Sequence, residues 1–393
     1  MARSSKYSLA DLLSAKEMVV VCGSGGTGKT TVAAAMGARA AATLGGRVLV
    51  LTVDPARRLA TALGLGAVGN TASQVPDTAF TEAGVECRGE LWVAMLDTKA
   101  GWDDLIRRHA PDATLREQVL ANPLYRNITG RFVNSHDYIA MEQLHDLHAS
   151  GRYDLVIIDT PPSRNALDLL DAPGRMREFF GSRLLKWLTV PYRSRLFTVA
   201  SKPFYQVADR VLGSRFLQDI AEFFILFQTM EAGFVQRATE VERLLTDDRT
   251  TFVVVSTLEA APAREARFLA DELRRRRMPL GAMVLNRTLP AGLRQPAVAK
   301  AAVKLREVAA DAAAVRELAK TASSRPAQVR DVLVEVADRF RDVTVVAGRE
   351  AERRAELETA APVTAVVPTL PSDVHDLAGL LALGGHLLGN GSR

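Results

Sequence analysis

The sequence predicts a doubly wound α/β fold built on a mainly parallel sheet of about seven strands. Three observations support this prediction: short apolar, β-branched runs recur along the chain, long helical patterns separate them, and several runs are apolar at every position. A strand without polar alternation is typical of a sheet that helices cover on both faces. Strands that alternate with helices favour parallel pairing.

The predicted strands are Met18–Cys22, Val48–Val53, Leu91–Leu96, Leu155–Asp159, Phe252–Ser256, Ala282–Asn286 and Val363–Val367. Two intervals between them are too long for a simple crossover, and both have helical patterns. We therefore interpret residues 1–393 as one domain that carries a helical subdomain over residues 164–250. A second helical elaboration is expected over residues 288–360.

Composition excludes several classes of protein. The 393 residues are 48% hydrophobic and 24% charged, with a net charge of +5, which excludes a disordered or fibrous chain. No apolar run approaches the roughly 20 residues of a membrane span, and the first residues lack the apolar region of a secretory signal. Cys22 and Cys87 are the only cysteines, which excludes a disulfide scaffold and a four-thiolate zinc site within one chain. We expect a cytoplasmic protein, with peripheral association with a membrane left open.

A glycine-rich segment follows the first predicted strand and precedes an Ala-rich helical pattern. It consists of Gly23, Ser24, Gly25, Gly26, Thr27, Gly28, Lys29, Thr30 and Thr31, and it matches the P-loop pattern G-x-x-x-x-G-K-[ST]. In such a loop, backbone N–H groups and a helix N-terminus surround phosphate groups. Lys29 is expected to reach the β- and γ-phosphates of ATP, and the Thr30 hydroxyl to bind Mg²⁺.

Two aspartates end predicted strands and lead into proline-containing loops. Asp54 follows the second strand, and Asp159 ends the fourth. A carboxylate at this edge of a parallel sheet can hold Mg²⁺ or position an attacking water molecule. We therefore assign Asp54 and Asp159 as metal ligands, and Asp54 together with Lys29 as catalytic residues. Asp before Pro is also a common turn, so the assignment rests on the two aspartates together.

Three segments of the chain resemble, in their order, those of the ArsA-like ATPases: the P-loop, Asp54-Pro55-Ala56 and Asp159-Thr160-Pro161-Pro162. This family includes the guided-entry ATPases that target tail-anchored membrane proteins. The resemblance covers most of the chain and implies an ATP- and Mg²⁺-dependent ATPase that works as a nucleotide-gated dimer. It also implies that Asn286 reads the adenine and that the loop containing Pro368 and Asp373 covers the base. An Asn amide offers both a donor and an acceptor, although Asn also commonly ends a strand.

One position of the P-loop departs from the family pattern. The family carries a lysine where this chain has Ser24, and that lysine reaches the partner's phosphates. A hydroxyl cannot span a dimer interface, so a homodimer should hydrolyse ATP poorly unless another cation substitutes. Arg57 and Arg58 are candidates for that cation. Alternatively, the chain forms a heterodimer with a lysine-bearing paralogue, and it then resembles the serine-variant subunit of actinobacterial-type pairs.

Other family features are missing or changed. The zinc-binding Cys-x-x-Cys of the eukaryotic targeting members is missing, so no zinc is expected, and the cysteine triad of the metalloid pumps is missing too. A metalloid-pump role is therefore disfavoured. Ser163-Arg164-Asn165 stands where the family often has Thr-Gly-His.

Three classes of function remain at this stage. The first is an energy-coupling ATPase, in which the aromatic-rich residues 179–234 either hold a hydrophobic client helix or form their own core or a subunit interface.

The second is a positioning ATPase of the MinD or ParA type, acting on membrane or DNA. Its membrane form would need a basic amphipathic C-terminal helix, and its DNA form would depend on the arginines of residues 264–277. These arginines also suit a helix C-terminus, so nucleic acid is disfavoured as a partner. A metabolic kinase or synthetase is disfavoured because no acceptor site is visible.

Overall fold

The computed structural model describes residues 7–53, 63, 69, 71–96, 98–110, 112–122, 125, 135–162, 167, 170–172, 174, 175, 178 and 231–389. Several residues singled out from the sequence lie outside this set. They are Asp54, Arg57, Arg58, Ser163, Arg164, Asn165 and the aromatic residues between positions 179 and 230. Most of the expected helical subdomain, residues 164–250, lies outside it as well.

The described residues form a doubly wound α/β sheet, which confirms the predicted fold class. The strands are β1 (Met18–Gly23), β2 (Arg47–Thr52), β3 (Ser73–Gln74), β4 (Glu90–Met95), β5 (Leu155–Asp159), β6 (Thr250–Ser256), β7 (Leu280–Thr288) and β8 (Val363–Pro368). Their order is β3-β4-β2-β5-β1-β6-β7-β8, and every pair is parallel except β3–β4. Seven strands were expected; the additional strand, β3, has only two residues, too few to produce an apolar run.

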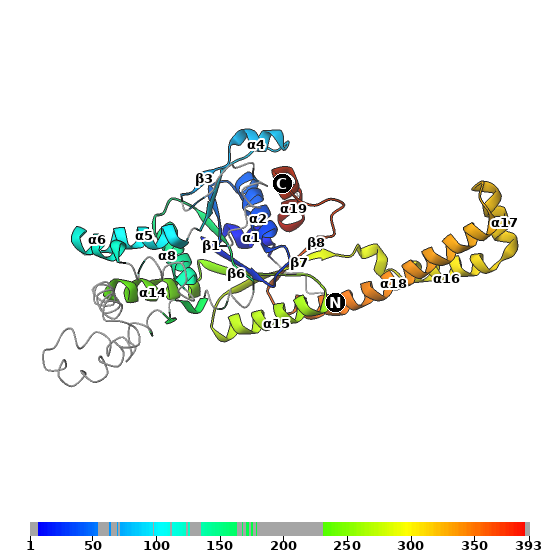
Figure 1. Cartoon of the computed structure of the whole chain (residues 1–393). Coiled ribbons are helices and arrows are strands. Elements are labelled where there is room, and N and C mark those ends of the chain that lie inside the picture. The colour runs from blue at the N-terminus through cyan, green and yellow to red at the C-terminus, as the bar shows by residue number, and fades with distance from the viewer. Residues whose placement is uncertain are drawn as a thin grey trace, which may run out of the picture.

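Helices cover both faces of the sheet because side chains along each strand alternate between two hydrophobic clusters. On one face, Val19 and Val21 of β1 pack with helices α1 (Leu9–Ser14), α2 (Lys29–Thr43), α4 (Asp77–Glu82) and α19 (Leu377–Leu388). Figure 1 shows this layer above the sheet, with α2 and α19 side by side. Gly384 of α19 allows this contact, since a Cβ there would lie 2.6 Å from Cβ of Arg39.

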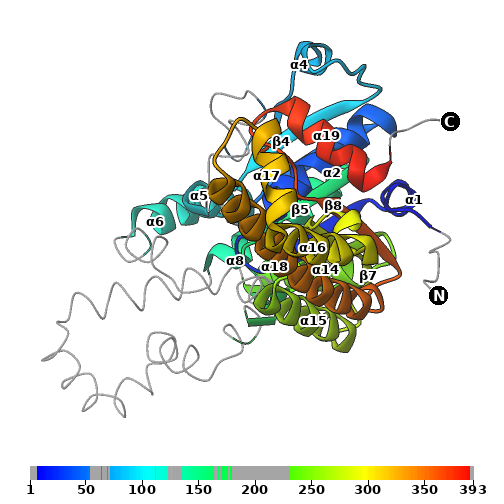
Figure 2. The same cartoon turned by 90° about the vertical axis from the view of Figure 1, so that its right-hand side faces the viewer.

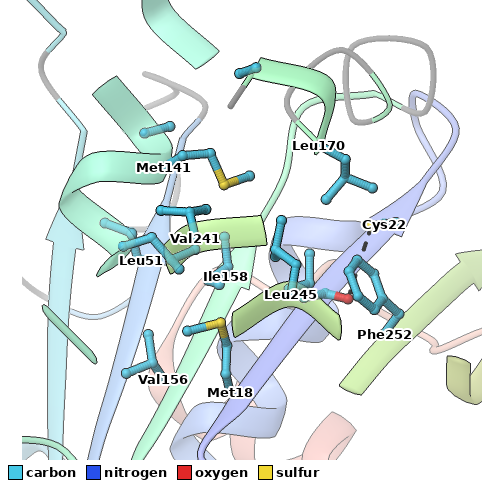
Figure 3. Close-up of a cluster of buried hydrophobic side chains, with 14 of the residues drawn as sticks. Met18, Cys22, Leu51, Met141, Val156, Ile158, Leu170, Val241, Leu245 and Phe252 are labelled. Carbon is cyan, nitrogen blue, oxygen red and sulfur yellow. Dashed lines mark hydrogen bonds between the residues drawn. The ribbon is translucent and has the colours of Figure 1, made fainter. Parts of the chain in front are cut away.

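The opposite face is covered by α5 (Thr98–His109), α6 (Ala113–Ala121), α8 (Ser135–Ala149), α14 (Glu231–Thr246) and α15 (Ala260–Arg275). Met18, Val20 and Cys22 of β1 point into this second cluster. In Figure 3, Cys22 lies among Leu170, Leu245 and Phe252. Both faces of the central strands are thus buried, as their unbroken apolar runs predict.

Three helices between β7 and β8 project from the body as an arm. After the short 3₁₀ helix η1 (Ala291–Arg294), they are α16 (Pro296–Ala310), α17 (Ala312–Thr321) and α18 (Pro326–Glu358). The 33 residues of α18 span about 50 Å. Its C-terminal end rejoins the body, where Leu357 is fully buried, and the rest extends outward beside α16 (Figures 1 and 2).

Within the described residues, every helix is too short or too polar to traverse a lipid bilayer.

Candidate functional site

The glycine-rich loop joins the carboxyl end of β1 to the N-terminus of α2, the context that its pattern requires. Gly23 lies so close to β6 that a Cβ there would be 2.1 Å from the carbonyl oxygen of Val255. Gly28 caps α2 with a φ of 89°, and a Cβ there would be 2.5 Å from Nδ2 of Asn286. Both positions therefore require glycine, one for the approach of a strand and the other for a left-handed turn beside a side chain.

Lys29 is folded back onto its own loop. Its side chain is 7% exposed, and its Nζ donates a hydrogen bond of 3.0 Å to the carbonyl oxygen of Ser24. The hydroxyl of Thr27 donates to the same oxygen at 2.9 Å. These contacts hold the ammonium group of Lys29 at the loop, where the N–H groups of an α-helix N-terminus also favour an anion.

Ser24 is itself buried, at 7% exposed, and its hydroxyl oxygen has no hydrogen-bond partner among the described residues. An unpartnered buried hydroxyl is uncommon and costs free energy unless a ligand or water molecule completes it.

Asp159 is fully buried at the carboxyl end of β5. Its Oδ2 accepts hydrogen bonds from Thr30 at 2.6 Å and from Thr52 at 3.0 Å. A carboxylate beside a threonine hydroxyl is the hard oxygen donor set that Mg²⁺ prefers, and Mg²⁺ usually takes few protein ligands because water and phosphate supply the others. The residues present therefore fit Mg²⁺.

Asp54 lies outside the described residues, but the position of its neighbour is described. The N–H of Val53 donates to the carbonyl oxygen of Asp159 at 3.1 Å, so the chain enters the Asp54 segment beside the end of β5.

Asn286 connects β7 to the P-loop across the sheet. Its Nδ2 donates to the carbonyl oxygen of Thr27 at 2.8 Å, and its Oδ1 accepts the N–H of Arg287 at 3.0 Å. The predicted strand ended at Asn286, but β7 continues to Thr288, so this predicted boundary is wrong. Each polar atom of the amide has one further hydrogen-bonding position, which is the capacity that reading an adenine edge requires.

A pocket of about 770 Å³ opens at this edge of the sheet, a volume within the range of cofactor sites. Its lining brings together four segments, the P-loop with the start of α2, the ends of β5 and β7, and the loop from β8 into α19: Gly25, Gly26, Gly28, Lys29, Thr30, Thr31, Ala34, Thr160, Pro162, Asn286, Arg287, Pro368, Thr369, Leu370, Ser372, Asp373, Val374, Leu380 and Leu383. Nine of the residues to which the sequence assigned a binding, catalytic or metal role are among them. Gly23, Ser24, Thr27 and Asp159 do not line the pocket but bond to or support residues that do.

Sequence reasoning gave no role to several polar residues of this site, and two of them contact its central residues. Thr52 donates to Asp159, and Arg287 lines the pocket and donates to the P-loop at Gly26. Thr52 is the one polar residue in an otherwise apolar run before Asp54, and Arg287 directly follows Asn286. The sequence could have indicated both residues, since each lies at the carboxyl end of a predicted strand, where that strand reaches the P-loop edge of the sheet.

The two cysteines lie at opposite edges of the sheet, Cys22 near the carboxyl end of β1 and Cys87 before the amino end of β4. Burial raises the pKa of the Cys22 thiol to about 12, which leaves it protonated and unreactive. The two thiols therefore do not form a joint site for a metalloid.

The arginines near residue 270 lie beside carboxylates. The pairs are Arg267 and Arg274 with Asp271, Arg275 with Glu272, and Arg276 with Asp171 and Glu272. The C-terminal helix α19 buries Leu380, Leu381 and Leu387 against the body. The paired arginines thus belong to a surface of mixed charge, and α19 packs as part of the body.

Among the aromatic residues expected between positions 179 and 234, Phe234 is described. It is fully buried and packs against Trp102 of α5, with ring centroids 6.4 Å apart. At this position, the aromatic side chain belongs to the protein's own core.

Residues 16–312 match the model of the anion-transporting ATPase family, ArsA. The chain belongs to this family. Its members are ATPases that use ATP and Mg²⁺ and are typically dimeric. The chain is also 29% identical, over 273 residues, to an uncharacterized protein of Streptomyces coelicolor. That match covers 69% of this chain and 62% of the relative, so the chain spans less than two thirds of the relative's length.

Proposed function

We propose that this ArsA-family chain binds ATP in the pocket at the carboxyl edge of the sheet and hydrolyses it in an energy-coupling cycle. The observation that carries the proposal is that one pocket is lined by the P-loop, by Thr30 with its hydrogen bond to Asp159, and by Asn286. Lys29 would bind the β- and γ-phosphates, and Asp54 would position the attacking water molecule. Asn286 would read the adenine, with Pro368 and Asp373 in the loop that covers it.

Thr30, Asp54 and Asp159 would hold Mg²⁺, which would neutralise charge on the phosphates. Thr52 would keep the Asp159 carboxylate oriented through its 3.0 Å hydrogen bond. The nucleotide state would change the closure of a dimer, and closure would be coupled to a transport, targeting or chaperone-like task.

The test is equilibrium binding of ATP and ADP with Mg²⁺, followed by the release of phosphate. Lys29→Ala should weaken binding roughly 10- to 100-fold, because a hydrogen bond to a charged group contributes about 1.5–3 kcal/mol. Lys300→Ala, on the exposed surface of α16, is the matched control and should bind as wild type does. Thermal unfolding without nucleotide checks that both variants fold. Wild type that binds neither nucleotide at millimolar concentration would overturn the proposal.

We further propose that Ser24 makes this chain the complementary half of a heterodimer with a lysine-bearing paralogue. Ser24 has a neutral hydroxyl and is buried in its own loop, so it supplies no cation to a partner's phosphates. Tagged protein isolated from its source cell with Mg²⁺ and ATP should carry such a paralogue at one-to-one stoichiometry. A homodimer that hydrolyses ATP as fast as its Ser24→Lys variant would contradict the pairing and direct attention to Arg57 and Arg58.

A further inference from the structure

Arg287 has an unusual backbone at the mouth of the pocket. Its φ is 54°, in the left-handed region, and among the described non-glycine residues only Arg277 and Ser323 share a positive φ. A non-glycine residue adopts this conformation at a cost in free energy and commonly does so at functional sites. The N–H of Arg287 bonds to Oδ1 of Asn286, which fixes where the turn begins.

The side chain of Arg287 extends over the P-loop. Its Nη1 donates a long hydrogen bond of 3.4 Å to the carbonyl oxygen of Gly26, and both residues line the pocket. The residue is exposed, and the described part of the chain shows no carboxylate within ion-pair distance of its guanidinium. Arg274 and Arg276, by contrast, each have a carboxylate partner.

A guanidinium has five N–H donors in a planar fork that matches phosphate oxygens, and Arg287 uses one of them on a neutral carbonyl. The positive charge therefore stands beside the phosphate loop without a negative partner. We propose that Arg287 is a second phosphate-binding cation of this pocket, which acts beside Lys29 on the phosphate chain of a bound nucleotide. This inference rests on the proposed function of the same pocket. Arg287 would also supply, within one chain, positive charge that Ser24 does not bring to the loop.

The experiment compares Arg287→Ala with Arg277→Ala. Arg277 is also an exposed arginine, with a φ of 59°, but it follows α15 and does not line the pocket, so its replacement makes the same side-chain change at the same backbone conformation away from the site. Dissociation constants of ATP, ADP and adenosine are measured by calorimetry at two salt concentrations. Arg287→Ala should weaken ATP and ADP binding by about tenfold or more and change adenosine binding by less than about twofold. Its affinity for ADP should also depend less on salt. Arg277→Ala should match wild type for all three ligands.

Arg287→Gln keeps a side chain of similar length without the charge, and it serves as the second variant if Arg287→Ala unfolds at a lower temperature. Equal losses for adenosine and ADP would overturn the inference, because they would indicate a contact with the base or a general change of the pocket. ATP and ADP binding as in Arg277→Ala would overturn it too, while the proposed function would stand on wild-type binding. Absence of nucleotide binding by wild type would overturn both.

Discussion

Helix α2 at the P-loop edge of the sheet and the α16–α18 arm both contain many alanines, but they are packed differently. In α2, which starts at the P-loop, 11 of 15 residues are buried, whereas α18 buries 3 of its 33 residues. Strands and α19 enclose α2, and α18 packs along one side against α16. Val332, Val345 and Val346 of α18 are 59%, 50% and 47% exposed. Packing therefore constrains α2 tightly at the site, whereas α18 leaves most of its surface open to solvent.

This difference predicts where substitutions will be tolerated. Close packing from two sides leaves no room for an added methyl group, and it transmits any shift to the pocket. A helix with one covered face responds mainly through its intrinsic helix propensity. The predictions below test this contrast.

The largest effect is expected for Gly23→Ala. The new Cβ would lie 2.1 Å from the carbonyl oxygen of Val255, so β1 and β6 would have to separate just before the P-loop. We expect a loss of about 2–4 kcal/mol in the free energy of unfolding, together with weaker ATP binding. Denaturant unfolding and nucleotide titration measure the two effects. Gly26→Ala is the comparison within the loop, because a Cβ at Gly26 meets no atom of the described residues within 4 Å and the strain there is confined to its φ of 79°. If Gly23→Ala were as stable as wild type, the close approach of the two strands would be contradicted.

A matched pair of helix glycines should show effects of opposite sign. A Cβ at Gly37 of α2 would lie 2.3 Å from Cγ2 of Val50, whose branched side chain cannot rotate freely. A Cβ at Gly348 of α18 meets no atom within 4 Å in the part of the chain that the structure describes. Gly37→Ala should cost about 1–2 kcal/mol after the gain in helix propensity, and Gly348→Ala should stabilise its helix by about 0.5–1 kcal/mol. Thermal unfolding reports the first, and hydrogen exchange of the α18 amides reports the second. If both substitutions stabilised the protein, α2 would have room for a methyl group at Gly37, and the close contact with Val50 would be contradicted.

The contrast between the two regions also explains how much could be predicted from sequence. The buried strands and the P-loop were predictable because unbroken apolar runs and the spacing of Gly28, Lys29 and Thr30 carry a local signal. The contact between Asn286 and Thr27 was not, because the two residues are 259 positions apart and only the strand order brings β7 beside β6 and β6 beside β1. The left-handed backbone of Arg287 had no sequence signal either, since arginine has no preference for that conformation. The helical pattern before β8 indicated helices, but nothing in it indicated that α18 extends away from the body.

The smallest effect on the pocket is expected from removing the arm. Leu289 and Glu350 are adjacent, since the N–H of Leu289 donates to Oε2 of Glu350 at 3.1 Å, so a few Gly and Ser residues can replace residues 291–347. None of the residues removed lines the pocket. ATP and ADP dissociation constants should therefore stay within about twofold of wild type, a change of less than about 0.5 kcal/mol. Glu350→Ala in the full-length chain is the control for losing the hydrogen bond between Leu289 and Glu350 alone. A tenfold weaker affinity in the shortened protein, with Glu350→Ala unchanged, would mean that the arm stabilises β7 and Asn286 at a distance, and the two regions would then be one cooperative unit.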